Sequence, residues 1–204
     1  IQRHGYIEFL RRNSERSIIK VVSGIRRCGK STLFRLFKDE LLAEVVKPEQ
    51  IISINFEELE YEPLREYHAL YQYILNQIQP NQMNYIFLDE IQHVDQFHRV
   101  VDSLFVKENT DIYITGSNAY FMSSDIATLL TGRYVEIQML PLSFAEFYFS
   151  KYEEQQYSLI PAYEAYLRES SFPYTQQLGG EDFDIQEYLR GLFNTLLLHD
   201  VVAR

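Results

Sequence analysis

The chain has little cysteine, no long apolar run and a deficit of positive charge. It contains one cysteine among 204 residues, which excludes an internal disulfide and is typical of a reducing compartment. No run approaches the roughly 18 apolar residues of a membrane-spanning helix. The N-terminal segment also lacks the apolar core of a signal peptide. We therefore expect a cytoplasmic protein that has no membrane partner.

Acidic residues outnumber basic residues, with 29 Asp and Glu against 19 Lys and Arg and a formal net charge of -10. A chain this acidic does not bind a polyanion with its whole surface, so any phosphate group must be held by local positive charge. Hydrophobic residues make up 46% of the chain, which is enough for the core of one domain with a small appendage.

Short β-branched and aromatic runs alternate with helical patterns over the first two thirds of the chain. Strand-like runs lie at 18–24, 51–57, 84–90 and 111–117, with a weaker one at 133–139. Helical spacing of apolar residues lies at 31–45, at 64–79 and from Phe97 to Phe105. This alternation predicts an α/β fold with a doubly wound parallel sheet.

The strand signals stop after Pro141, and the remaining chain shows helical patterns at 143–153, 157–169 and 185–203. We expect residues 1–142 to form an α/β core and residues 143–204 to form a small helical lid. The last helical pattern runs to Arg204 without a capping residue, Gly or Pro. We therefore expect the lid to lead into a further C-terminal region.

Residues 24–31, GIRRCGKS, match the phosphate-binding loop pattern G-x-x-x-x-G-K-[ST]. The match follows an apolar strand and opens a helix, so main-chain N–H groups and the positive helix end would face the phosphates. Lys30 would neutralise the β- and γ-phosphates, and Ser31 would ligate Mg²⁺. The predicted nucleotide-binding residues are Gly24, Ile25, Arg26, Arg27, Cys28, Gly29, Lys30, Ser31 and Thr32.

Two carboxylates, Asp89 and Glu90, follow the apolar run YIFL. A buried parallel strand that ends in acids directs them to the edge of the sheet where ligands bind. Asp89 is predicted to hold the Mg²⁺, and Glu90 to act as general base or to orient water for attack on the γ-phosphate.

The interval between Lys30 and Asp89 leaves room for a helix, a strand and a second helix, so the acidic strand is the third. This spacing favours the additional-strand catalytic-glutamate type of P-loop NTPase, with strand order 5-1-4-3-2. The end of the fourth strand would then lie beside the γ-phosphate. Asn118 and Ser117 are alternative candidates for a polar sensor there, and either one is equally suited to cap a helix.

The strings SGIRRCGKSTL, IFLDEIQ, ITGSN and LLTGRYVEIQMLPLSFAEF occur in this order. In them the chain resembles prokaryotic AAA-superfamily P-loop ATPases that carry a C-terminal domain of unknown function. The resemblance implies ATP and Mg²⁺ as ligands, and an unidentified protein or DNA partner reached through a missing C-terminal domain. Assembly of identical chains is a further expectation. Relatives often have Gly-Gly before a Phe-Pro pair, where this chain has Ser170-Ser171.

Arg133, which follows Gly132, is the candidate for a positive charge that reaches the transferring phosphate. It would act within its own chain or from a neighbour. The alternative is a surface arginine paired with Glu136 or Glu146.

The leading hypothesis is an Mg²⁺-dependent ATPase that drives or switches a partner domain. A non-hydrolysing ATP-binding switch is the alternative from a different class. A small kinase is less consistent with a glutamate beside the metal-binding Asp89, and a GTPase would require an N-K-x-D motif that is absent. The five histidines show no metal-ligand spacing with Cys28, so we expect no zinc site. Glu57 and Glu58, which follow the second strand, are either nucleotide sensors or a solvated strand end.

Overall fold

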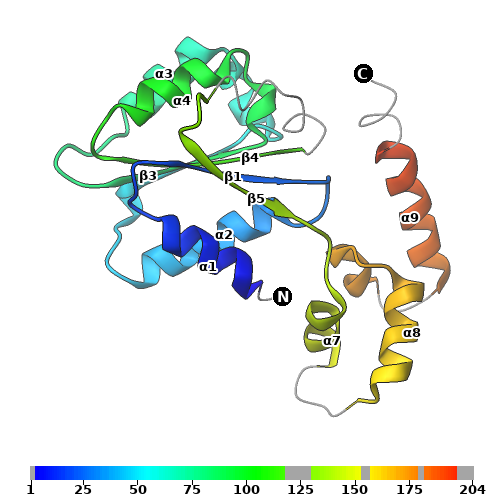
Figure 1. Ribbon diagram of the computed structural model, residues 1–204. Helices are drawn as coiled ribbons and strands as arrows, with labels where there is room; N and C mark the ends of the chain where they lie inside the picture. Colours follow the sequence, from blue (N-terminus) through cyan, green and yellow to red (C-terminus); the bar gives the residue numbers. More distant parts are fainter. Residues whose placement is uncertain (1–2, 118–129, 153–156, 179–181, 197–204) are drawn as a thin grey trace. The chain divides into compact units, whose positions relative to one another are not determined.

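The computed structural model describes residues 3–117, 130–152, 157–178 and 182–196 (Figure 1). The chain divides into two compact units, which we call the sheet unit and the helical unit. The sheet unit comprises residues 4–24 and 30–139, and the helical unit comprises residues 1–3, 25–29 and 140–204. The helical unit therefore contains the middle of the predicted phosphate loop as well as the C-terminal helices.

The sheet unit is built on five parallel strands, as predicted. The strands are β1 (Ile19–Gly24), β2 (Ile51–Asn55), β3 (Asn84–Asp89), β4 (Thr110–Ser117) and β5 (Tyr134–Met139). Their order is β2-β3-β4-β1-β5, which is the predicted order 5-1-4-3-2 read from the other edge. The α/β P-loop NTPase fold is thus confirmed. Because the strands are parallel, Gly24 lies beside Ser117 and Met139, where the carboxyl ends of β1, β4 and β5 meet.

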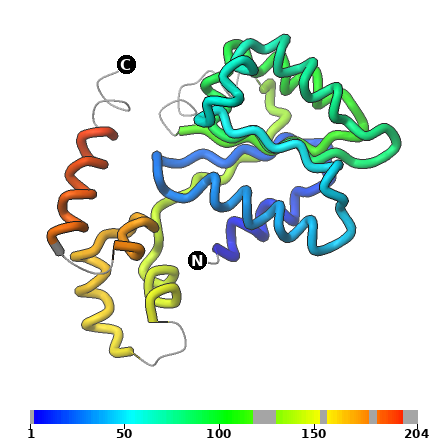
Figure 2. The backbone as a smooth tube through the Cα atoms, turned by 180° about the vertical axis from the view of Figure 1, so that it is seen from behind, coloured from blue at the N-terminus to red at the C-terminus, as the bar shows by residue number. Residues whose placement is uncertain are grey.

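Helices cover both faces of this sheet, with α1 and α2 on one face and α3 and α4 on the other (Figures 1 and 2). The α-helices are α1 (His4–Asn13), α2 (Lys30–Ala43), α3 (Tyr67–Leu75) and α4 (Phe97–Phe105). Short 3-10 helices are η1 (Pro48–Gln50), η2 (Leu59–Arg65) and η3 (Ile91–His93).

Two helices differ from the sequence expectation. The helix expected at 64–79 starts instead at Tyr67, where the Glu66 carboxylate accepts hydrogen bonds from the His68 and Ala69 N–H groups. Pro63 lies in η2. Helix α1 was not predicted; it is ten residues long, and only Leu10 and Asn13 in it are buried.

The two faces of the sheet are packed with different side chains because neighbouring strand residues point to opposite faces. The face under α3 and α4 is aliphatic and includes Ile86, Leu88 and Ile114. The face under α2 is aromatic, with the Phe87 and Tyr113 rings stacked 4.6 Å apart between centroids. This double cover buries the central strands β1, β3 and β4 and leaves their carboxyl ends to carry polar groups.

In the C-terminal part of the helical unit, the described secondary structure consists of helices, as the helical patterns predicted. It comprises α7 (Phe144–Tyr152), α8 (Leu159–Glu169), η4 (Pro173–Gln177) and α9 (Asp182–Leu196). Ser170 ends α8 with φ 74° and ψ 163°, a backbone conformation that is almost confined to glycine. Within the described ranges, none of the helices has the length and apolar composition that crossing a bilayer requires.

Candidate active site

The predicted phosphate loop connects Gly24 at the end of β1 with Lys30 at the start of α2. Arg27 has φ 64° and Gly29 has φ 108°, so the loop turns through two left-handed residues. Glycine lacks the Cβ that makes this conformation unfavourable, which explains the second glycine of the motif. The Cys28 side chain is 0% exposed, and its N–H donates to the Ile25 carbonyl at 3.3 Å. The loop is therefore a tight turn with an inward-facing thiol.

Lys30 is the central charge of the site. Its side chain is 3% exposed, and Nζ donates to the Gly24 carbonyl at 3.1 Å. The same Nζ lies 3.1 Å from Oε1 of Glu90, which follows β3 directly. The structure thus brings together the lysine of the loop and the predicted general base.

Asp89, at the end of β3, is 6% exposed and accepts hydrogen bonds from the hydroxyls of Thr115 and Ser31. Burial raises the pKa of Asp89 against the effect of these two donors, and the nearby charge of Glu90 raises it further. The donors and positive charge near an ionised Asp89 therefore do not fully offset the cost of burying it. Ser31 and Asp89, the two predicted metal ligands, lie within one hydrogen bond of each other.

Besides Lys30, Glu90 contacts Thr115 and Gln92, and its backbone is strained, with φ 55° and ψ 48°. Its N–H donates to Thr115 Oγ1 at 2.9 Å, and Gln92 Nε2 donates to its carboxylate. Thr115 therefore bridges the backbone of Glu90 and the carboxylate of Asp89. Sequence reasoning placed Thr115 at the tip of the fourth strand but missed this bridge, and it missed Gln92 altogether.

The donor set fits Mg²⁺. This cation prefers oxygen ligands and is commonly held by one or two protein groups together with substrate phosphates. The Ser31 hydroxyl and the Asp89 carboxylate supply such oxygens side by side. A second group of potential ligand atoms, from Glu57, Glu90 and His93, lies within 4.8 Å of one another. Glu57 is thus close to the predicted general base.

Several predicted residues at this edge contribute less to the described geometry. Arg27 and Thr32 are exposed, and Arg26 is half-buried. Ser117 is buried at the end of β4, whereas Asn118 lies outside the described residues.

Arg133 is not near the loop of its own chain. It immediately precedes β5, and its carbonyl accepts from Ile19 N at 2.9 Å, at the amino ends of the strands. The loop begins at the other end of β1, where Gly24 pairs with Met139. Six residues of strand span about 20 Å, so the Arg133 side chain does not reach Lys30 in the same chain.

Arg133 is a surface arginine, as the alternative expected, but it lies beside Asp102 rather than Glu136 or Glu146. Glu136 accepts from the Ser23 hydroxyl, and Glu146 pairs with Arg3. Arg133 is 48% exposed. Its Nη1 lies 3.9 Å from Asp102 Oδ1, and its guanidinium lies over the Phe105 ring.

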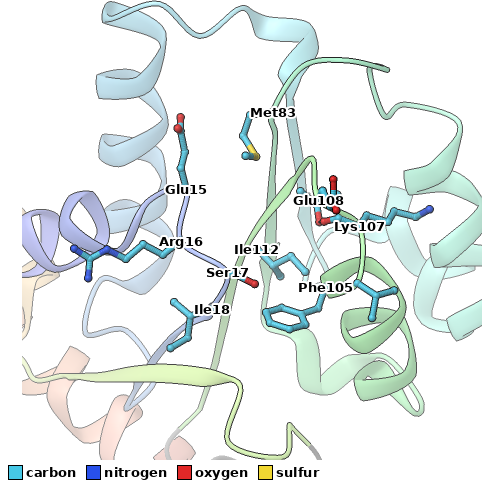
Figure 3. Close-up of a pocket in the computed structure, with 11 residues that line it drawn as sticks. Glu15, Arg16, Ser17, Ile18, Met83, Phe105, Lys107, Glu108 and Ile112 are labelled. Atoms are coloured by element: carbon cyan, nitrogen blue, oxygen red, sulfur yellow. The ribbon is translucent and has the colours of Figure 1, made fainter.

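A cavity of about 500 Å³ lies at the amino ends of the strands (Figure 3). Its lining includes Ile18 before β1, Phe105 at the end of α4 and Ile112 in β4. These positions are at the opposite end of the sheet from Gly24 and Asp89. The cavity is therefore separate from the phosphate-loop site.

Residues 16–148 match a protein family described as an AAA domain. The chain belongs to this AAA domain family. An uncharacterized protein of Haemophilus influenzae is 38% identical to it over 207 residues, which cover 100% of this chain and 51% of that protein. A protein of Methanocaldococcus jannaschii is 34% identical and covers 91% of this chain and 42% of its own length. This AAA domain thus spans about half the length of the curated relatives it matches.

Solved structures share the fold of the AAA domain at low sequence identity. The Walker-type ATPase PABY2304 of Pyrococcus abyssi aligns with a TM-score of 0.62 and 17% identity, over 99% of this chain and 75% of its own. DnaA from Aquifex aeolicus, bound to AMPPCP, aligns with a TM-score of 0.54 and 10% identity, over 96% and 60%. DnaA bound to AMPPCP and single-stranded DNA aligns with a TM-score of 0.57 and 12% identity, over 98% and 67%.

Proposed function

We propose that this AAA domain binds ATP with Mg²⁺ and hydrolyses it, and that the reaction drives or switches a partner. One observation carries the proposal: Lys30, Ser31, Asp89 and Glu90 converge at one edge of the sheet. The family supports a P-loop ATPase, and the related DnaA structures contain AMPPCP, an analogue of ATP.

Nucleotide binding would depend on local charge, because the chain as a whole repels anions. The N–H groups of the loop and the start of α2 supply partial positive charge, and Lys30 adds a full one. Ser31 and Asp89 would hold the Mg²⁺, which when bound neutralises charge on the phosphate oxygens. This cation would also stabilise the ionised form of Asp89, whose burial is otherwise unfavourable.

Glu90 would orient the attacking water and accept its proton. Before it can do so, its carboxylate must exchange its contact with Lys30 for one with water. The phosphates of an incoming nucleotide compete for the same ammonium and so favour this exchange. Gln92 and Thr115 hold Glu90 near its place while the contact changes.

Arg133 would serve a nucleotide bound to a neighbouring chain, because it lies too far from the loop of its own chain. This role requires assembly of identical chains. Asn118 or Ser117 would act as the polar sensor at the end of β4. The partner would be a protein or DNA contacted through a region outside the 204 residues, since the matched relatives are about twice as long.

The test is to measure ATP binding and phosphate release for the wild type and for two variants. Lys30→Ala is expected to abolish binding, and Glu90→Gln is expected to bind while releasing no phosphate. Lys47→Ala and Glu49→Gln change exposed residues outside the site and serve as matched controls. Full phosphate release by Glu90→Gln would refute the role of Glu90.

The same assay separates the alternatives. If the full-length wild-type protein binds ATP tightly but releases no phosphate, alone or with candidate partners, the result supports a non-hydrolysing switch. Transfer of label to an acceptor supports a kinase, and preference for GTP in competition overturns the choice of ATP.

A further inference from the structure

Arg3 is a buried arginine that contacts the phosphate loop. Its side chain is 6% exposed, and Nη1 donates to the Cys28 carbonyl at 3.1 Å. Nε donates to Glu146 Oε1 at 2.8 Å, while Nη2 donates to Glu146 Oε2 and to the Pro141 carbonyl, both at 3.3 Å. All four residues belong to the helical unit. The planar guanidinium therefore joins the loop to the start of the C-terminal helices.

The contact with Cys28 determines which way a loop amide points. A peptide bond is planar, and the described chain contains no cis peptide bond. The carbonyl of Cys28 and the N–H of Gly29 therefore point in opposite directions. Gly29 is the second glycine of the motif, and its N–H belongs to the turn that encloses phosphate. By holding the Cys28 carbonyl, Arg3 keeps the Gly29 N–H directed away from itself.

Glu146 sets the position of Arg3 and is itself part of a helix cap. The Ser143 N–H donates to Glu146 Oε2 at 2.8 Å, and the Glu146 N–H donates to Ser143 Oγ at 3.3 Å. This reciprocal pair is a capping box at the start of α7. The Glu146 carboxylate thus caps the start of α7 and also accepts two hydrogen bonds from the Arg3 guanidinium. Any movement of the start of α7 is transmitted to the guanidinium.

We propose that Arg3 is a positioning residue that preorganises the phosphate loop, and that Glu146 makes its position depend on α7. The proposal rests on nucleotide binding at the loop, as proposed above. Loss of Arg3 frees the Cys28–Gly29 peptide to rotate, so the loop must be ordered again each time it binds phosphate. A preorganised amide contributes equally in the ground state and the transition state. Arg3 therefore affects nucleotide affinity and not the rate of the chemical step.

The experiment compares wild type, Arg3→Ala, Arg3→Lys and Glu146→Gln for ATP affinity by calorimetry, and for KM and kcat by phosphate release. Loss of a charged hydrogen-bond donor predicts that Arg3→Ala raises Kd and KM about tenfold, with kcat within about twofold of wild type. Lysine cannot form the paired hydrogen bonds of the guanidinium with Glu146, so the Kd of Arg3→Lys is expected to lie between those of wild type and Arg3→Ala. Glu146→Gln is expected to raise Kd about threefold. Arg11→Ala is the matched control, because Arg11 pairs with Glu40 on the surface of the sheet unit.

A merely structural role would lower the active fraction and hence kcat, and it would leave KM unchanged. Equal Kd values for wild type, Arg3→Ala and Glu146→Gln would overturn this inference alone. Failure of the wild type to bind any nucleotide would overturn the proposed function, and this inference with it. If Arg3→Ala does not fold, Arg3→Lys and Glu146→Gln decide, since both retain the buried volume.

Discussion

The ammonium of Lys30 and the carboxylate of Glu90 form a buried ion pair, with Nζ and Oε1 3.1 Å apart. Because a triphosphate must compete with Glu90 for Lys30, removing the carboxylate charge favours the nucleotide. We expect Glu90→Gln to bind ATP about three- to tenfold more tightly than wild type and to lose at least about 100-fold in kcat. Calorimetry and phosphate release measure the two effects. Weaker ATP binding by Glu90→Gln would contradict the competition.

Asp89 is expected to lower the stability of the ligand-free protein while it supplies a ligand for Mg²⁺. Burial raises the pKa of its carboxyl, so the ionised form destabilises the ligand-free protein at neutral pH. Asp89→Asn retains an oxygen that accepts from Thr115 and Ser31. We expect this variant to unfold at a higher temperature than wild type without ligand, and to lose the Mg²⁺ dependence of nucleotide binding. A lower unfolding temperature for Asp89→Asn than for wild type, measured by calorimetry, would show that neighbouring groups offset the cost of burying the Asp89 carboxylate.

Ser170 is a site at which a single substitution should stabilise the chain. Its φ of 74° and ψ of 163° are unfavourable for a residue with a Cβ. Ser170→Gly relieves this strain, offset in part by the greater freedom of glycine in the unfolded state. We expect a net gain of about 1 kcal/mol and a rise of about 2–4 °C in Tm. The matched control is Ser158→Gly, at an ordinary extended residue before α8, which should stabilise nothing.

Lys20 and Asp111 form an ion pair inside the sheet unit, with side chains 0% and 1% exposed. Asp111 also accepts from Tyr113 Oη at 2.6 Å and from Glu15 N–H at 2.8 Å. Replacing Lys20 with Met leaves the Asp111 charge buried without its cation. We expect Lys20→Met to lower the free energy of unfolding by about 3–5 kcal/mol in urea titrations. A loss as small as that of the exposed pair variant Arg11→Ala would show that Asp111 is satisfied by its neutral donors.

Glu146 should make stability depend on pH. Burial alone raises the pKa of its carboxyl, but hydrogen bonds from Arg3 and from the Ser143 N–H lower it by more, so the net pKa lies below 4.5. A carboxyl whose pKa is lowered by folding stabilises the protein above its unfolded pKa, and this stability is lost as pH falls through the folded value. We expect Glu146→Gln to be less stable than wild type at pH 7, and the difference to shrink as pH falls below 4.5. A difference independent of pH in urea titrations would exclude this linkage.

Much of the fold was predictable because its signals are local. Each strand is a short apolar run, and parallel order followed from the interval between Lys30 and Asp89 and from the alternation with helices. The pairing of loop and acidic strand also followed, since parallel strands end at one edge of a sheet. Helix α1 was not predicted, since it is ten residues long and precedes the first strand, outside the alternation of strand and helix patterns.

The unpredicted parts of the site depend on contacts between distant residues. Arg3 and Glu146 are 143 positions apart, and a single arginine near the N-terminus carries no periodic signal. Thr115 bridges Asp89 and Glu90 through one hydroxyl, which only the register of β3 and β4 places there. Arg133 was assigned a role from residue type and motif, whereas its distance from Lys30 depends on the direction of β5.

Cys28, the single cysteine of the chain, lies in the turn formed by residues 25–29 with its thiol buried, and its carbonyl accepts a hydrogen bond from Arg3. A maleimide reagent can reach Cys28 only when that turn opens, and no second cysteine competes for the label. The rate of Cys28 alkylation therefore reports how often the turn opens, and no cysteine has to be introduced as a probe. Nucleotide occupancy and the state of α7 would both be readable as changes in this one chemical rate.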